Sequence, residues 1–128
     1  MNSGPPVHAC FDFPAFDTGE YEGATLVLDE GCAELVVRVD GREPLRLQFD
    51  RVRWHRFTSQ YASRTEWISE AYFKLIKLEH SPELQALAEG ESRLVNKPYK
   101  GLFHYRVFLD ETGTHEFIAE SVSASWVK

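Results

Sequence analysis

Two histidines, an arginine and several carboxylates lie within one short stretch of this 128-residue sequence, HYRVFLDETGTHEFIAES at residues 104–121. Histidine and carboxylate side chains are common protein ligands of zinc, and they also act as general acids and bases. A shared site would require His104 and His115 to lie close together. Whether they do depends on the secondary structure that carries them.

The alternation of apolar and polar residues around DETG predicts a β-hairpin with a loop at residues 110–114. The predicted contacts are Leu109 facing His115, Val107 facing Phe117, Tyr105 facing Ala119, His104 facing Glu120, and Arg106 diagonal to Glu116 and Glu120. In this register His104 and His115 lie on opposite faces and roughly five residues apart along the strands, at about 3.3 Å per residue, which is too far for one metal ion. We therefore predict cross-strand charge pairs and no metal site.

A second stretch, RVRWHRF at residues 51–57, interleaves arginines with aromatic residues. Such interleaving is typical of surfaces that stack single-stranded nucleic acid, and of arginine-lined pockets for anions. The candidate anion or nucleic-acid ligands are Arg51, Arg53, His55 and Arg56, with Lys97, Tyr99 and Lys100 as a second wall. The alternative is structural: Val52 and Trp54 pack inward, and the arginines pair with the acidic first third of the chain.

Acidic residues are concentrated at the start of the chain. Residues 1–41 contain eight acidic residues and one arginine, a net charge of −7, and the whole chain carries −6. This region would repel a phosphate backbone, and it would attract a basic protein surface and speed its association. The candidate partner-binding residues are Asp17, Glu20, Glu22, Asp29 and Glu30.

No motif typical of an enzyme or a cofactor site is present. The sequence contains no GxSxG and no phosphate-binding glycine loop, and Cys10 and Cys32 do not have the spacing of a zinc site. We therefore expect a protein that is not an enzyme and that binds no metal or cofactor. The cysteines are expected to be buried or semi-buried free thiols, with a single disulfide as the alternative. The start without a signal-peptide pattern and the lack of a long apolar run predict a cytoplasmic protein with no membrane partner.

Most of the chain alternates with a period of two residues, which predicts strands. Strands are expected in ATLVLDEG and AELVVRVDG, which are joined by an acidic turn, in PLRLQFDRVRWHRF, in residues 72–79 and in both halves of the hairpin. In PLRLQFDRVRWHRF the inward-facing positions change from odd to even near Asp50 and Arg51, which predicts a bend or bulge in one long strand. A turn or short helix is expected at residues 63–70.

One helix is clearly specified, at residues 82–89. Ser81 is its expected N-cap, Pro82 suits the first helical position, and Gly90 is the expected stop. Residues 91–101 are expected to form a loop.

These elements together predict one domain over residues 1–128, α+β in class and mainly antiparallel β. About six or seven strands would form a half-barrel or sandwich, with the short helix near residues 82–89 closing one end. At 43% hydrophobic residues, a chain of this length can bury a core without disulfides or metals.

The order LRLQFDRVRWHRFT, AYFKLIKLEHSPELQAL and FHYRVFLDETGTHEFIAES resembles small bacterial proteins of uncharacterised type, some of them encoded near polymorphic toxins and regarded as immunity-like. The resemblance implies an antiparallel β-rich fold with one helix and no catalytic residues, and it does not cover the acidic first third. The leading hypothesis is a protein-binding module, an immunity protein that neutralises a basic toxin through its acidic surface. The alternative is a β domain that binds a small ligand, an anion or single-stranded nucleic acid through residues 51–56. Monomer and homodimer are both left open.

Overall fold

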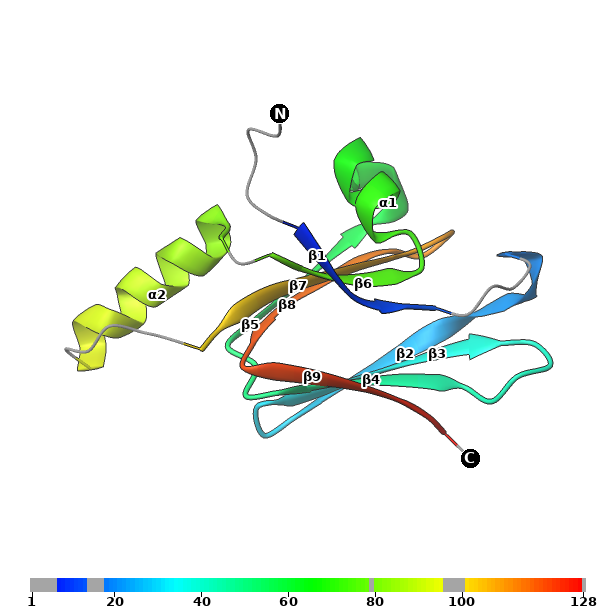
Figure 1. Cartoon of the computed structure of the whole chain (residues 1–128), viewed down its shortest axis with the longest axis horizontal. Coiled ribbons are helices and arrows are strands. Elements are labelled where there is room, and N and C mark those ends of the chain that lie inside the picture. Colours follow the sequence, from blue (N-terminus) through cyan, green and yellow to red (C-terminus); the bar gives the residue numbers. More distant parts are fainter. Residues whose placement is uncertain (1–6, 14–17, 79, 96–100, 128) are drawn as a thin grey trace.

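The computed structural model describes residues 7–13, 18–78, 80–95 and 101–127. It is a sandwich of two antiparallel sheets, with two helices on the outer side of one of them (Figure 1). The five-stranded sheet has the order β1 (Val7–Asp12), β6 (Lys74–Leu78), β7 (Phe103–Leu109), β8 (Gly113–Ala119) and β5 (Trp54–Ser59). The four-stranded sheet has the order β2 (Tyr21–Asp29), β3 (Cys32–Val39), β4 (Leu45–Asp50) and β9 (Ser121–Trp126). The helices are α1 (Thr65–Ala71) and α2 (Pro82–Val95), with short 3-10 turns η1 (Thr18–Glu20) and η2 (Gln60–Ala62).

The predicted fold class, α+β and mainly antiparallel β, is confirmed, and the sheets form a sandwich. The strand at residues 72–79 and the short helix at residues 63–70 are confirmed as β6 and α1. The described residues contain nine strands rather than six or seven, because β1 and β9 were not predicted and because the predicted long strand at PLRLQFDRVRWHRF is two strands, β4 and β5. The sequence of β9, SVSASW, does alternate serine with Val122, Ala124 and Trp126, a pattern that was overlooked, and this edge strand is held by its pairing along β4.

Apolar residues from the inner faces of both sheets form the main core. Leu35 of β3 and Val107 of β7 are fully buried in it. At its centre the rings of Phe49 and Phe117 stack with centroids 4.0 Å apart. The two sheets are therefore held together by the apolar halves of their alternating strands.

The outer face of the five-stranded sheet has a second, smaller apolar cluster. It consists of Ala71, Ile76 and Phe108, with Ile68 packed against it. This cluster fixes α1 on the sheet. Strands β7 and β8 are consequently buried on both faces, and their polar residues are enclosed together with the apolar ones.

The predicted bend near Asp50 and Arg51 is a break at which the chain passes from one sheet to the other. Arg51 follows β4 with φ of 54°, and the next strand, β5, belongs to the opposite sheet. The N–H of Val52 then donates to the carbonyl of Gly31 at 2.6 Å. The position of the break is confirmed, but the prediction of one long strand is wrong, because its two halves pair with different neighbours.

The hairpin at residues 104–121 forms, but its register differs from the predicted one by two residues. The facing pairs are Leu109 with Gly113, Val107 with His115, Arg106 with Glu116, Tyr105 with Phe117 and His104 with Ile118. The loop is shorter than predicted because Gly113 can begin the strand: it has φ of 144° and lies so close to the carbonyl of Thr58 that no Cβ would fit. A shift of two residues leaves each side chain on its predicted face, so His104 and His115 do lie on opposite faces.

Helix α2 begins where predicted and ends later. The Oγ of Ser81 accepts the N–H of Leu84 at 3.0 Å, which confirms Ser81 as the N-cap. The prediction that Gly90 stops the helix is wrong, since α2 continues through residues 91–95, which were expected as loop. A glycine ends a helix when it adopts a left-handed φ, and Gly90 does not adopt one.

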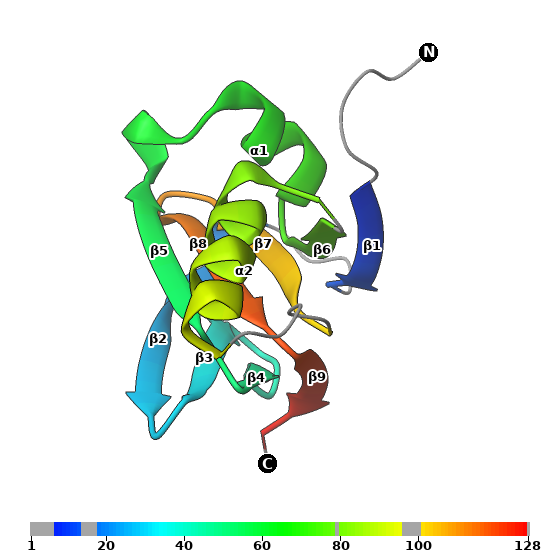
Figure 2. The ribbon, with the colours of Figure 1, turned by 90° about the vertical axis from the view of Figure 1, so that its left-hand side faces the viewer.

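Two edge strands lie on the same side of the sandwich, β5 of the five-stranded sheet and β2 of the four-stranded sheet (Figure 2). Inner-facing residues are poorly covered here: Leu28 of β2 is 56% exposed and Phe57 of β5 is 47% exposed. The sandwich is therefore open between β2 and β5. Both charged segments predicted from the sequence reach this side.

Candidate functional site

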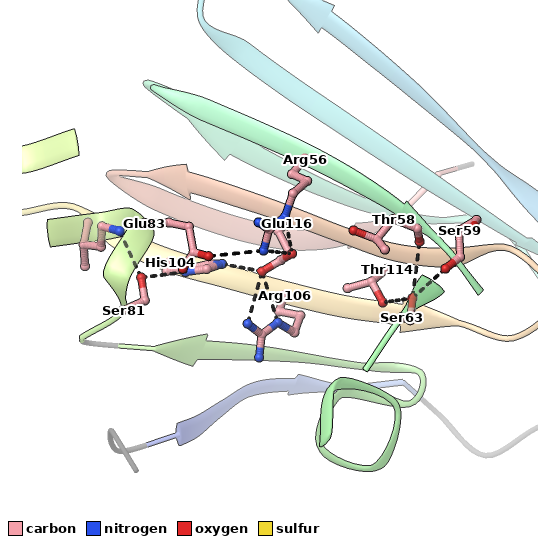
Figure 3. Close-up of polar contacts among 11 residues, drawn as sticks. Arg56, Thr58, Ser59, Ser63, Ser81, Glu83, His104, Arg106, Thr114 and Glu116 are labelled. Atoms are coloured by element: carbon pink, nitrogen blue, oxygen red, sulfur yellow. Dashed lines mark hydrogen bonds and ion pairs between the residues drawn. The ribbon is translucent and has the colours of Figure 1, made fainter. Parts of the chain in front are cut away.

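A buried cluster of charged side chains, centred on Glu116, lies on the outer face of the five-stranded sheet (Figure 3). Arg56 donates to one oxygen of Glu116 from Nε and Nη2, at 3.0 and 2.7 Å. Arg106 donates to the other oxygen from Nε and Nη2, at 3.2 and 3.1 Å. His104 donates to that second oxygen from Nε2, at 2.6 Å. The predicted contact of Arg106 with Glu116 across the hairpin is confirmed, but the predicted pair His104–Glu120 is wrong, because His104 contacts Glu116 instead.

This Glu116 cluster extends to the first turn of α2. The other ring nitrogen of His104, Nδ1, lies within hydrogen-bond distance of the hydroxyl of Ser81, 2.8 Å away. The same Ser81 caps the helix, and Oε2 of the next acid, Glu83, lies 3.4 Å from Nη2 of Arg56. The cluster thus attaches the start of α2 to the sheet.

Two tryptophans cover the guanidinium groups of the cluster. Arg56 lies 5.1 Å from the ring centre of Trp54 and 5.3 Å from that of Trp67. Arg106 lies 4.8 Å from the ring centre of Trp67. These cation–π contacts exclude water and fix Trp54, which also lines the cleft described below.

Burial by itself raises the pKa of Glu116, but hydrogen bonds from His104 and Arg56 and the charge of Arg106 together lower it to about 2. Burial lowers the pKa of Arg106, and the Glu116 carboxylate offsets part of that effect. Glu116 is therefore ionised, fully buried and bonded at both oxygens. These properties suit a role in holding the fold rather than proton transfer to a substrate.

A histidine pair lies on the inner face of the same sheet. Nε2 of His55 and Nδ1 of His115 are 3.5 Å apart, with the rings inclined by 22°. Burial, followed by the charge of His55, lowers the pKa of His115 to about 4. Burial also lowers the pKa of His55, against the opposite effect of Glu116. Burial therefore favours the neutral form of both rings.

The predicted partner-binding acids that the structure describes lie along one edge of the molecule. They are Glu20 in η1, Glu22 and Asp29 in β2, and Glu30 in the turn to β3, and we call them the acidic edge. All four are exposed, and in the described part of the chain none of their carboxylates pairs with a basic side chain. The fifth candidate, Asp17, lies outside the described residues.

The arginines of residues 51–56 have glutamates as neighbours. Nε of Arg51 lies 3.9 Å from one oxygen of Glu120, and Nη2 of Arg53 lies 3.8 Å from the other. Arg56 belongs to the Glu116 cluster. The described ion-pair partners of these arginines are Glu83, Glu116 and Glu120 rather than acids of the first third of the chain.

The aromatic residues of this segment are also placed differently from the prediction. Val52 packs against the main core as predicted, but Trp54 faces the outer side, with its ring centre 5.5 Å from that of His104. The inner face of β5 presents His55 and Phe57 instead, because the break before β5 resets the alternation. The proposed second wall, Lys97, Tyr99 and Lys100, lies outside the described residues.

A cleft of about 320 Å³ lies between the β2–β3 turn and the start of β5. Its apolar walls are Leu28, Val52 and Trp54, and its polar walls include Asp29, Glu30, Arg53 and His55. The cleft therefore joins two sites that the sequence analysis treats as separate. Carboxylates beside apolar walls suit an aliphatic side chain that ends in a positive charge, and they oppose an anion.

Other residues of this site were missed by sequence reasoning. Leu28 and Phe57 are exposed apolar residues at this opening, and only the pair Val27–Leu28 directly before an acidic turn hints at them in the sequence. Cys32 also lines the cleft; it is a free thiol, as predicted, but the prediction that it is buried or semi-buried is wrong, because it is exposed. Three members of the Glu116 cluster, His104, Arg106 and Glu116, lie in the hairpin stretch that the sequence singled out, whereas the contributions of Arg56 and of the first turn of α2 have no sequence signal, because those segments are far away in the chain.

Among the described residues, no group of three or more His, Cys, Asp or Glu side chains is arranged to hold a metal ion. None of the described helices is both long and apolar enough to cross a membrane. Comparison with protein-family models, with curated proteins and with solved structures found no match for this chain.

Proposed function

We propose that this protein is a non-enzymatic binding module that docks a basic protein partner on the acidic edge and the adjoining cleft. The observation that carries this proposal is a contrast between the two charged segments. The carboxylates of the acidic edge are exposed and form no ion pair with a basic side chain among the described residues, whereas Arg51, Arg53 and Arg56 each form an ion pair with a glutamate. Unneutralised charge attracts a partner of the opposite sign and raises its association rate.

A basic toxin is one partner of this class. The resemblance of the later part of the sequence to immunity-like proteins supports such a partner. In this function the protein acts by occupying the toxin's surface, so no catalytic group is required. Complementary charge gives rapid capture, and apolar contacts in the cleft slow dissociation.

The second candidate function is binding of a small ligand, an anion or single-stranded nucleic acid through residues 51–56. Arg53 and His55 line the cleft, and this is the observation that favours it. Asp29 and Glu30 line the same cleft and would repel phosphate, and Glu120 already lies beside Arg53. We therefore rank this function second.

The test is a selection of short peptides from a random display library on the immobilised full chain. Selected peptides are expected to be rich in lysine and arginine, and to bind more weakly as salt is added. The double variant Glu22→Lys with Glu30→Lys should abolish their binding. The matched control, Glu66→Lys with Glu89→Lys, changes the net charge equally at two exposed helix positions and should leave binding intact.

Equal loss of binding in both double variants would contradict a docking role for the acidic edge. A labelled single-stranded oligonucleotide provides the competing result. If it binds at low salt, and if Arg53→Glu weakens it regardless of base sequence, the second function replaces the first.

A further inference from the structure

We propose that the basic partner binds by adding an extended segment to the free edge of β2, as a fifth strand of the four-stranded sheet. This inference rests on the proposed function and specifies how the partner is held. Strand addition is a common mode of peptide recognition, in which backbone hydrogen bonds give affinity and side-chain pockets give specificity.

The backbone of β2 is available for this pairing. Asp29 faces Cys32 across a two-residue turn, in which Glu30 has φ of 47° and Gly31 has φ of 82°. From that closing pair, antiparallel alternation directs the N–H and C=O groups of every second residue, including Leu28, away from β3. In the described chain β2 pairs only with β3, so these groups face the open side of the sandwich.

The part of β2 that leads into the β2–β3 turn also lacks the features that usually block strand addition. Residues 24–29, ATLVLD, contain no lysine and no proline, and the register shift of this strand lies earlier, between Tyr21 and Gly23. Val27 and Leu28 are 55% and 56% exposed, one on each face of the sheet. An added strand would cover both side chains.

The cleft supplies a side-chain pocket for such a strand. A residue paired with Leu28 would point to the inner side of the sheet, as Leu28 does, and so toward the cleft. The apolar side chains of Leu28 and Val52 would contact the methylene groups of a lysine or arginine there. Asp29 and Glu30 would contact its charged end.

A second copy of this chain is a poor occupant of the edge. Centred antiparallel pairing of two β2 strands would bring Glu22 of one copy toward Asp29 and Glu30 of the other. Parallel pairing would place each acid beside its own equivalent. Like charges opposite one another destabilise a sheet, so the acidic edge disfavours self-pairing and favours a basic strand.

The test uses the full chain and a labelled peptide of alternating lysine and valine, about ten residues long. The peptide is expected to bind, and hydrogen exchange of the outward-facing amides of β2 should slow in the complex. A peptide of the same sequence with N-methyl groups on alternate residues keeps its charge but cannot form the ladder. It should bind at least about tenfold more weakly.

Two variants of Leu28 distinguish the contribution of its backbone N–H to peptide binding from that of its side chain. Leu28→Pro removes an outward N–H without breaking a hydrogen bond to β3, while Leu28→Ala shortens the side chain and keeps the N–H. Leu28→Pro is expected to weaken peptide binding about tenfold more than Leu28→Ala does. Thermal unfolding establishes that both variants fold; if Leu28→Pro does not, the N-methyl comparison on the unaltered chain decides the question.

Strand addition is overturned if the N-methylated and ordinary peptides bind equally and the β2 amides exchange at unchanged rates. If that binding still falls on reversal of Glu22 and Glu30, the proposed function survives without this mode of pairing. If the ordinary peptide does not bind even at low salt, or if the reversal has no effect, the proposed function itself fails.

Discussion

Glu116 shows how a buried charge is accommodated in a small sandwich. Moving a carboxylate out of water costs several kcal/mol, and here two guanidinium groups and an imidazole offset that cost with hydrogen bonds. The complete cluster is stable. Removing the Glu116 carboxylate, however, leaves Arg56 and Arg106 without their counter-charge.

We predict that Glu116→Gln lowers the free energy of unfolding by about 3 kcal/mol, because it leaves the two arginines partly or fully buried without that charge. The matched change Glu120→Gln removes an acid whose side chain is 40% exposed and should cost less than about 1 kcal/mol. Urea unfolding at neutral pH measures both. Equal midpoints for the two variants would show that the Glu116 cluster does not hold the fold.

The histidine pair makes stability depend on pH. His115 has a folded pKa of about 4, below its ordinary value of 6.5, so between these values the unfolded chain binds more protons than the folded one. The contribution of His115 to the free energy of unfolding is therefore fully present above about pH 6.5. It is lost as the pH falls toward 4, and the loss amounts to roughly 3 kcal/mol. Glu116 has the same sign, and its contribution is lost as pH falls from about 4.5 to about 2.

His115→Gln is expected to flatten the dependence of unfolding free energy on pH between about 6.5 and 4, since the neutral amide does not titrate. The exposed histidine His80, changed in the same way, serves as the control. Denaturant unfolding at a series of pH values gives the two slopes. A slope unchanged by His115→Gln would show that this imidazole is not kept neutral by the fold.

At the scale of elements, helix α2 is held at one end. Its first turn is joined to the sheet through Ser81 and Glu83, which contact His104 and Arg56. Gly90 lies well beyond this attachment, and nothing would contact a Cβ placed on it. The helix therefore continues past Gly90 with helical backbone geometry rather than through any packing at that position.

Gly90→Ala is expected to raise the free energy of unfolding by up to about 1 kcal/mol, because alanine loses less backbone entropy in a helix interior. Gly31→Ala is the contrasting variant: its φ of 82° is unfavourable for alanine, and it should lower stability by about 1 kcal/mol. Thermal unfolding compares the two. A loss of stability in Gly90→Ala would mean that Gly90 is a left-handed helix stop after all.

At the scale of the whole molecule, the two sheets place opposite charges around one opening. The acidic edge follows β2, and the arginines at the start of β5 lie across the cleft, each beside a glutamate. The net field on this side is therefore set by the acids. An open sheet edge is usually prone to self-association, and here acidic residues lie at both ends of that edge.

Neutralising the acidic edge with Glu22→Gln and Glu30→Gln is expected to increase self-association, since the repulsion between two β2 edges is removed. Glu66→Gln with Glu89→Gln changes the net charge equally, away from that edge, and should have no such effect. Sedimentation velocity at matched concentrations measures the difference. Equal association of both variants would show that total charge, rather than its position, keeps the chains apart.

The sequence by itself determined those features that depend on local pattern. Period-two alternation identified most strands and the fold class, and the parity change located the break near Arg51. Ser81 was identifiable as a helix cap because capping involves only neighbouring backbone groups. Even the faces of the hairpin were correct, since alternation survives a register shift of two residues.

Only the tertiary structure decided which residues from distant segments of the chain come into contact. The hairpin register depends on Gly113 against Thr58 of another strand, and the partners of Glu116 come from β5 and β7. The order of strands within each sheet brings the edges of β2 and β5 to one side. Sheet order is set by which strands pair most favourably over long chain separations, and no local pattern encodes that choice. For this reason the acidic edge and the arginine-rich segment were both visible in the sequence, while the cleft they share was not.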